Sequence, residues 1–403
     1  MKRYILILLC VVASIFCADA QRKEVYTHRT YTTVAGNRHE IHIPQVKGFN
    51  VYKGDFHVHT AYSDGQVTPA GRVDEAWRDG LDILAITDHL EGRSGERRFF
   101  KVVAPYNKNG KPTRQIVAGS SRMPKNGVDP GIKADFNAIH REAEVQVRSK
   151  GYNMLLVKGC EMARNKEKLG HYNALFITDA RKVYNYDLKV AFKNAHEQGG
   201  IIIHNHPGNI NRYNTEWLKE VYSAGMIDGV EVANGYRYYP YMTTRCIKDK
   251  LTMFGNTDAH GQTATQYLDN GQLRTMTLVL AKELTEEAIK EAILKRRTIA
   301  YSGGDLIGEE SWLKELLNAS VDCRLVNEDK KAGKRTYRLT NLSSFAYRFR
   351  RGKTIYELLP FKSITFSFGK DKKTGKLMAP KLHVENMWVA DYKHPTIEFE
   401  IDK

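Results

Sequence analysis

Cysteine is scarce in this chain, which has five cysteines among 403 residues. Two of them lie within the first twenty residues, and the others are Cys160, Cys246 and Cys323. Such an odd and widely spaced set of thiols cannot form a disulfide framework, even in a compartment that permits disulfides. The fold must therefore be stabilised by a hydrophobic core, and a chain of this length can bury a large one in about two to three domains.

Long apolar runs are equally scarce, because the only one lies at the start of the chain. Residues 1–20, MKRYILILLCVVASIFCADA, place two basic residues before an apolar stretch that ends in Ala-Asp-Ala. This order is typical of a secretory signal peptide and predicts export to the periplasm or the cell exterior; an uncleaved anchor is the alternative. No later stretch approaches the ~20 apolar residues of a spanning helix, so stable membrane insertion of the mature protein is not expected.

Acidic residues are outnumbered by basic ones, 46 against 62, which gives a formal net charge of +16. A basic surface attracts phosphate-rich small molecules, nucleic acid or an anionic membrane, and charge alone does not choose among them. Basic and aromatic residues interleave only in YRFRRGK, residues 347–353, and a run of this kind is more often a solvated strand end than a nucleic acid site. We therefore expect no specific nucleic acid partner.

Short β-rich runs alternate with helical segments over residues 51–305, after a polar, basic extension at residues 21–50. Near-continuous apolar strands separated by helices are typical of a parallel sheet that is buried on both faces. About seven such strands predict an α/β fold with a closed or distorted TIM-like barrel. Residues 92–133, rich in Gly, Pro, Lys and Arg, interrupt the alternation, so we expect an insertion there that is either a lid or a solvated excursion.

A second pattern begins at residue 306. An amphipathic helix near residues 308–319 precedes runs in which apolar and polar residues alternate, with turn-rich gaps between them. A period of two is typical of strands with one buried face. Residues 306–403 are therefore expected to form a C-terminal helix and a small antiparallel β-sandwich-like domain.

Metal-binding side chains stand at one end of nearly every predicted strand of the first domain. His57 and His59 lie two positions apart on one strand, so their imidazoles point to the same face, and Asp64 follows in a Ser-Asp-Gly turn. A lone histidine is more often a core residue, but strand ends that lead into helices meet at one rim of a barrel, so the repetition predicts a polynuclear metal site. The other candidates are His89, Glu161, His171, His204, His206, Asp258 and His260.

Imidazole and carboxylate ligands without an obvious thiolate suit Zn, Mn or Fe better than an iron–sulfur cluster. Cys160 is the only cysteine beside a candidate ligand, Glu161. Because neighbouring side chains on a strand point to opposite faces, Cys160 is expected to face away from the site as a buried apolar residue.

The motifs HVH, SDG, TDH, GCE, GHYNALF, HP and TDAH follow one another in this order between about residues 55 and 304. The series resembles the polymerase and histidinol phosphatase (PHP) family of metal-dependent phosphoesterases. The resemblance implies a distorted (β/α)7 barrel with up to three divalent ions. It implies three ligand sets, which are His57, His59, Glu161 and Asp258, then Glu161, His171 and His206, and finally Asp64, His89 and His260.

Two further residues, His204 and Glu231, have the chemistry of a metal ligand but lie outside these three sets. His204 and His206 lie two positions apart on the fifth predicted strand and are expected to face the same way, so His204 remains an alternative ligand. His206 is preferred because the family's ligand precedes a proline, and His204 is then expected as an outer residue beside the substrate. Glu231 has the chemistry of a ligand, but the family pattern does not require it and we leave it out.

The resemblance also implies a function, the hydrolysis of small phosphate diesters or monoesters by a metal-activated water. Glu161, Asp258 and His206 are then the expected catalytic residues, and Arg212, followed by Arg93, is the expected phosphate-binding arginine. Export and the trailing β domain are most similar to the secreted phosphodiesterases of the family.

Two other functions remain as alternatives. A polynuclear site that activates water can also hydrolyse amides or lactones. A polyanion-binding or glycan-binding module with a structural metal is the second alternative, although structural sites need few ligands and this chain offers nine candidates in its expected sets.

Overall fold

The computed structural model describes most of the chain, namely residues 38–90, 136–165, 167–208, 214–371 and 374–401. The signal peptide predicted at residues 1–20, most of the extension at residues 21–50 and the insertion at residues 92–133 lie outside the described residues, as do Arg93 and Arg212. Residues His39–Lys403 form one compact unit. Among the described helices, none combines the length and the apolar character needed to cross a membrane.

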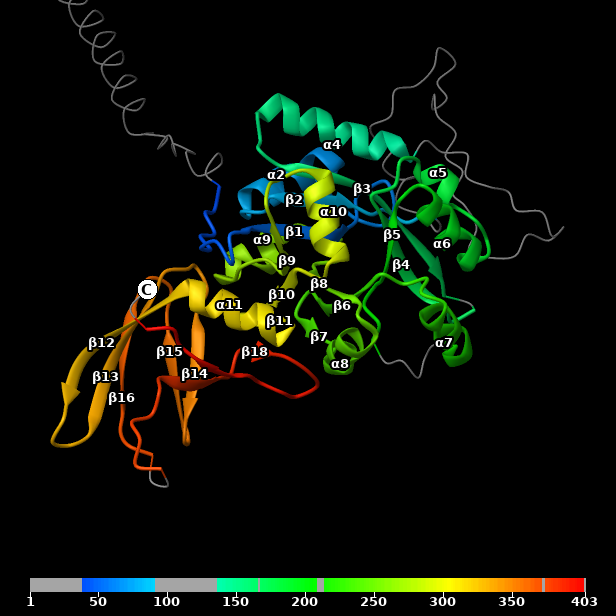
Figure 1. The fold of residues 1–403 in the computed structure, drawn as a ribbon. Coiled ribbons are helices and arrows are strands. Elements are labelled where there is room, and N and C mark those ends of the chain that lie inside the picture. Colours follow the sequence, from blue (N-terminus) through cyan, green and yellow to red (C-terminus); the bar gives the residue numbers. More distant parts are fainter. Residues whose placement is uncertain (1–37, 91–135, 166, 209–213, 372–373, 402–403) are drawn as a thin grey trace, which may run out of the picture. The chain divides into compact units, whose positions relative to one another are not determined.

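Seven strands form a curled ring that positions the site (Figure 1). Neighbouring strands pair in order from β1 to β6, and β8 pairs with β6. Where the ring meets itself, a bridge joins Val58 to Ala259, and the Asp258 amide donates to the His57 carbonyl at 2.9 Å. This arrangement confirms the distorted barrel. The strands are β1 (Asn50–Val58), β2 (Ile83–Ile86), β3 (Leu155–Arg164), β4 (Gly170–Leu175), β5 (Ile201–His204), β6 (Gly229–Asn234) and β8 (Thr252–Asn256).

The sheet is mixed, so the expectation of a purely parallel sheet was wrong. Strand β4 runs antiparallel to both β3 and β5. The reason is the short connection between Arg164 and Gly170, since a parallel crossover needs a dozen or more residues. Antiparallel strands also extend the sheet from β1, through β9 (Met276–Ala281) and β10 (Thr298–Ser302) to β11 (Asp305–Gly308). A short strand, β7 (Arg237–Tyr238), pairs with β6.

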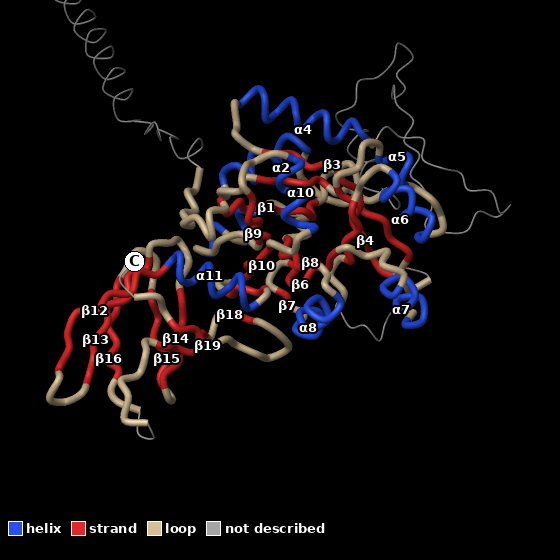
Figure 2. The backbone as a smooth tube through the Cα atoms, viewed as in Figure 1, coloured by secondary structure: helices blue, strands red, loops and turns tan. Residues whose placement is uncertain are grey.

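Helices lie around this sheet (Figure 2). Helix α2 begins where its sequence dictates, because the Thr68 hydroxyl accepts a hydrogen bond from the Gly71 amide and proline occupies the first turn. Residues of β2 alternate between two hydrophobic clusters, one shared with α2 and one with α10, as expected for a sheet buried on both faces. The helices are α2 (Pro69–Arg78), α4 (Asn137–Lys150), α5 (Ala180–Val183), α6 (Leu188–Glu197), α7 (Thr215–Ser223), α8 (Pro240–Asp249), α9 (Thr263–Gln266), α10 (Glu286–Leu294) and α11 (Glu310–Ser320).

Two antiparallel sheets form the C-terminal part of the chain. Their facing surfaces pack through Phe349, whose ring lies 6.3 Å from that of Phe366 and 5.7 Å from that of Phe399. This sandwich matches the expected second architecture. One sheet contains β12 (Val321–Asp329), β13 (Lys334–Asn341) and β16 (Ser363–Phe368), and the other contains β15 (Thr354–Leu358), β14 (Tyr347–Arg351), β17 (Lys381–Val384) and β19 (Thr396–Glu398).

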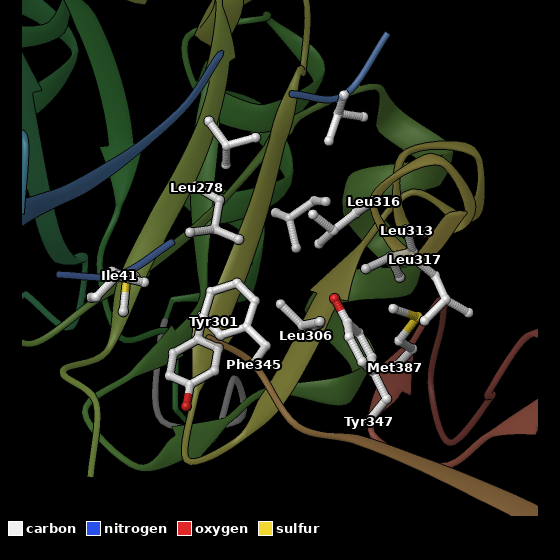
Figure 3. Packing of buried hydrophobic residues seen from close by; sticks show 14 of the residues in the cluster. Ile41, Leu278, Tyr301, Leu306, Leu313, Leu316, Leu317, Phe345, Tyr347 and Met387 are labelled. Atoms are coloured by element: carbon white, nitrogen blue, oxygen red, sulfur yellow. The ribbon is translucent and has the colours of Figure 1, made fainter. Parts of the chain in front are cut away.

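The sandwich and the barrel are joined through a shared sheet edge and a shared core. Strand β18 (Met387–Trp388) leaves the sandwich and pairs in parallel with β11 of the barrel sheet. Figure 3 shows Leu313 and Leu316 of α11 beside Leu306 and Met387, all in one continuous cluster of buried side chains. The second architecture is therefore packed firmly against the first.

Candidate metal centre

Histidine, aspartate and glutamate side chains gather where the strands of the ring end. His57 lies in β1, Glu161 in β3 and His171 in β4, and the others follow β1, β2, β5 and β8. The expected ligands form overlapping groups, in each of which the possible ligand atoms lie within 4.8 Å of one another. Together the groups contain His57, His59, Asp64, His89, Glu161, His171, His206, Asp258 and His260.

Four of these residues direct ligand atoms toward one point. His57 Nε2 and His59 Nε2 are 3.1 Å apart, and Asp258 Oδ1 lies 3.2 Å from the first and 3.1 Å from the second. The two oxygens of Glu161 approach the same nitrogens, each at 3.4 Å. Two ligands bound at about 2.1 Å to a tetrahedral ion stand about 3.4 Å apart. The spacing of these atoms therefore fits a single divalent ion.

Glu161 connects this group to a second one. Its Oε1 lies 3.1 Å from His171 Nδ1 and 3.6 Å from His206 Nε2, while its Oε2 lies 3.0 Å from His89 Nδ1. His171 and His206 thus meet at the carboxylate that the family pattern assigns to them, and His89 joins them there. A carboxylate with imidazoles at both oxygens can bridge two ions in a multinuclear site.

Asp64 holds a third set together with His89 and His260, which we call the outer group. Asp64 Oδ2 lies 3.5 Å from His89 Nε2 and 3.3 Å from His260 Nε2, and its Oδ1 lies 3.3 Å from His59 Nδ1. The side chains of Asp64 and His260 are 38% and 39% exposed, whereas that of Glu161 is 1% exposed. The outer group therefore opens to solvent at Asp64 and His260, and the ligand positions around Glu161, which we call the inner group, surround a carboxylate that is itself buried.

The hydrogen bonding of the acids tests whether these residues suit a cation. Glu161 Oε2 and Asp258 Oδ1 are both buried, and no group in the described part of the chain donates a hydrogen bond to either oxygen. Buried anionic oxygens without partners are costly. Both oxygens face imidazole nitrogens at the spacing of ligands around one ion, as described above. A divalent cation satisfies the oxygens and the nitrogens together, so the residues fit metal binding.

The acids also make the site strongly attractive to positive charge. Burial opposes ionisation of Glu161, but the surrounding imidazoles of His89, His171 and His57 hold its pKa well below the ordinary value. Burial likewise disfavours a protonated His57, yet Asp258, Glu231 and Glu161 raise the pKa of that imidazole well above its ordinary value. The carboxylates thus remain anionic and recruit protons or metal ions to the nitrogens beside them.

Glu231 is a functional residue that the sequence-based set omitted. Its fully buried carboxylate lies 2.7 Å from His57 Nδ1, and it accepts hydrogen bonds from the His206 amide at 2.6 Å and from Asn256 Nδ2 at 3.0 Å. A carboxylate that accepts from one imidazole nitrogen turns the other nitrogen toward a metal. The signal in the sequence was an acid within an otherwise apolar strand, which is costly to bury without a partner.

Two asparagines orient other members of the site. Asn205 Nδ2 donates to Glu161 Oε1 and to Asn173 Oδ1, both at 2.8 Å, and this carboxylate is therefore held from the end of β5. Asn165 Oδ1 lies 2.7 Å from His171 Nε2, which leaves Nδ1 of that ring facing Glu161. Sequence reasoning did not assign either asparagine, because an amide at a strand end is also common in turns.

His204 requires a correction. His204 and His206 were expected to face the same way, but β5 ends at His204, and His206 adopts a φ of 25°. The His204 ring is fully buried, stacks on Tyr172 at 4.8 Å and places Nδ1 2.7 Å from the Tyr222 hydroxyl. Burial lowers the pKa of His204 to about 3. His204 is thus a neutral core residue, and its burial excludes direct contact with a substrate.

Asp258 shares the unusual backbone of His206, with a φ of 55°. Non-glycine residues rarely adopt positive φ, and such strain persists where the surrounding structure fixes it. Here the Asp258 amide donates to the His57 carbonyl at 2.9 Å, and the His206 amide donates to Glu231. These two hydrogen bonds fix the backbone at both positions.

Cys160 was expected to be a buried apolar residue that faces away from the site. It is buried and packs in a hydrophobic cluster, as expected.

Comparisons with known proteins agree with this site. The PHP domain family model matches residues 55–270. A two-domain protein from Bacteroides vulgatus ATCC 8482, whose name describes a predicted PHP-like metal-dependent phosphoesterase, is 30% identical, with a TM-score of 0.74. That similarity covers 90% of this chain and 98% of the other, so it includes both architectures. No curated protein matches the chain.

Two further structures are more distant and carry no argument about function. One is named as a metal-dependent phosphoesterase, from Bifidobacterium adolescentis ATCC 15703, with 17% identity, a TM-score of 0.35 and coverage of 60% of this chain and 96% of the other. The second is an amidohydrolase from Chromobacterium violaceum with bound sulfate and no metal, with 14% identity, a TM-score of 0.33 and coverage of 52% and 87%.

The family match spans more than half of the residues and contains all nine clustered candidate ligands. The chain therefore belongs to the PHP domain family.

Proposed function

We propose that this protein is an exported phosphoesterase that hydrolyses small phosphate esters, diesters before monoesters, with up to three divalent ions of Zn, Mn or Fe. The observation that supports it most directly is the convergence of imidazoles on both oxygens of the buried Glu161 carboxylate. The predicted signal peptide supports export, and the formal charge of +16 suits an anionic substrate.

The ligand sets assign the ions to two regions. His57, His59, Glu161 and Asp258 would hold one ion of the inner group, and His171 and His206 would hold another with Glu161. Asp64, His89 and His260 would hold the ion of the outer group. Divalent ions in such a cluster lower the pKa of water and neutralise phosphate oxygens.

The contribution of the chain is to fix these ligands before substrate arrives. Glu231 holds His57, and Asn205 holds Glu161, so the ligand atoms do not need to reorganise during the reaction. The exposed side chains of Asp64 and His260 make the outer group the side from which an ester can enter from solvent.

The test is a hydrolysis assay of the metal-loaded protein on bis-p-nitrophenyl phosphate, p-nitrophenyl phosphate and a panel of amides. We expect turnover of the phosphate esters and its loss after treatment with a chelator. Glu161→Ala is expected to lose bound metal and activity together, by more than ~100-fold. Glu197→Ala, at a 63% exposed side chain on α6, is the matched control and should change neither.

Two results would contradict the proposal. Hydrolysis of amides without hydrolysis of phosphate esters would replace it with the amidohydrolase alternative. A Glu161→Ala variant with full metal content and full turnover would remove the assigned centre.

A further inference from the structure

The side chain of Arg72 occupies an unusual position beneath the loops that carry the ligands. Arg72 lies in the first turns of α2 and is fully buried. Its guanidinium uses all five N–H donors of an arginine. One of them, on Nη1, reaches Glu75 Oε2 at 2.6 Å, and this ion pair neutralises the buried charge.

The other four donors of Arg72 all reach backbone carbonyls. Nε donates to His59 at 2.8 Å, Nη1 to Gly261 at 2.8 Å, and Nη2 to both Ala259 and His260 at 2.9 Å. Two of these carbonyls belong to clustered ligands, and Ala259 lies between Asp258 and His260. Arg72 therefore ties the chain after β1 to the chain after β8.

These two segments carry the exposed half of the site. Asp64 lies in the loop after β1, and His260 lies in the loop after β8. Apart from Arg72, a hydrogen bond from the Gln66 amide to the His260 carbonyl at 2.8 Å also connects them. The Asp88 carboxylate also supports the first loop, by accepting from Thr60 at 2.6 Å and 2.8 Å.

The inner group has a separate set of supports. Asn205 reaches Glu161 from β5, and Glu231 reaches His57 from β6. Arg72 takes part in neither of these two contacts. Glu161 and His57 are therefore held by side chains other than Arg72, which reaches the ligands of the inner group only through the His59 carbonyl.

We propose that Arg72 is a positioning residue that presets the outer group for a metal ion, and that its loss weakens binding of the outer ion more than binding of the inner ions. A lysine cannot replace it, because an ammonium lacks the planar fork that reaches several carbonyls at once. This inference rests on the metal centre proposed above.

The experiment measures metal binding directly. Chelator-stripped protein is titrated with Zn²⁺ and, separately, Mn²⁺, and site number and affinity are obtained by calorimetry, competition with a chromophoric chelator and elemental analysis. We expect Arg72→Lys to weaken the outermost ion by about 10- to 100-fold, the usual effect of removing a residue that orients ligands. The inner ions should lose less affinity than the outer ion, because Arg72 reaches the ligands of the inner group only through the His59 carbonyl.

The matched control is Arg297→Lys. Arg297 is also a mostly buried arginine that donates to a carbonyl, Leu280 at 3.0 Å, and pairs with a glutamate, Glu291. It precedes β10 and contacts none of the clustered ligands. This variant should bind every ion as the wild type does.

Three outcomes would overturn the role of Arg72. These are an Arg72→Lys variant that binds the outer ion with wild-type affinity, a uniform loss of affinity at all sites, and a wild type without an outer ion. A wild type that binds no divalent ion at all would instead refute the metal centre itself.

A measurement on the wild type keeps the inference testable if Arg72→Lys fails to fold. Hydrogen exchange of the metal-free protein reports whether the loops are held before ions bind. The amides of His59 and Gln66, which donate to Ala259 and His260, should be protected as well as those of the adjoining strands. Rapid exchange at these amides in an otherwise folded, metal-free protein would overturn the inference.

Discussion

Replacing Glu231 by glutamine tests whether the site depends on a buried carboxylate that the expected ligand set omitted. Its Oε1 receives His57 Nδ1 at 2.7 Å and Asn256 Nδ2 at 3.0 Å, and its Oε2 receives the His206 amide at 2.6 Å and Asn234 Nδ2 at 2.9 Å. The carboxylate thus accepts at every oxygen. A glutamine of the same shape must turn its amide group toward one of these two pairs of donors.

The magnitude follows from that mismatch. Each buried donor left without an acceptor costs about 1–3 kcal/mol in the free energy of unfolding. An amide that faces the His206 N–H and Asn234 leaves two such donors, about 2–6 kcal/mol, and one that faces His57 leaves only Asn256, about 1–3 kcal/mol. If the amide faces His57, Nδ1 must accept and the ring proton moves to Nε2, which then cannot bind a metal. Affinity for the inner ions should therefore fall by about 10- to 100-fold.

The assay combines urea denaturation, in the presence and absence of metal, with a competition titration for metal affinity. Glu197→Gln is the control, because its side chain is 63% exposed, and it should stay within about 0.5 kcal/mol of the wild type. A Glu231→Gln variant with wild-type stability and wild-type metal affinity would refute the reasoning. A loss of stability with unchanged affinity for the inner ions would limit Glu231 to a role in folding.

Further predictions concern the other supports of the site. Asn205→Ala removes the donor to Glu161 Oε1 and should weaken the inner ions by about 10-fold without affecting the outer ion, as measured by the same titration. Arg274→Met leaves Asp55 and Asp79 buried without their common cation and should cost about 3–5 kcal/mol in urea denaturation; a change below 1 kcal/mol would show that this network contributes little.

Local patterns predicted much of the fold, because the start, length and buried face of a helix or strand depend mainly on residues that are neighbours in the chain. Helix α2 spans Pro69–Arg78 as its apolar spacing, its Thr68 cap and its first-turn proline indicate. The antiparallel direction of β4 was missed, since periodicity gives the character of a strand and not its partner. Strands β12 and β15 have mostly exposed positions, which weakens the alternation by which a strand is recognised in a sequence.

The expected ligands also show which positions local strand rules predict and which they do not. His57 and His59 share a face because a strand separates them by one residue, and the structure preserves that relation. The same rule failed for His204 and His206, since the strand ends between them and the backbone turns to positive φ. Strand geometry can be applied only where the strand continues, and the sequence does not mark that point.

The sequence by itself determined the chemistry of the site, because the type and order of the histidines and acids are written in the chain and strand ends place them at one rim. Only the tertiary structure decided which candidate ligands lie close to one another and which residues hold them. Glu231 lies 174 residues from His57, and Arg72 lies 188 residues from His260. Contacts over such separations depend on how the ring closes, and no local pattern along the chain encodes that closure.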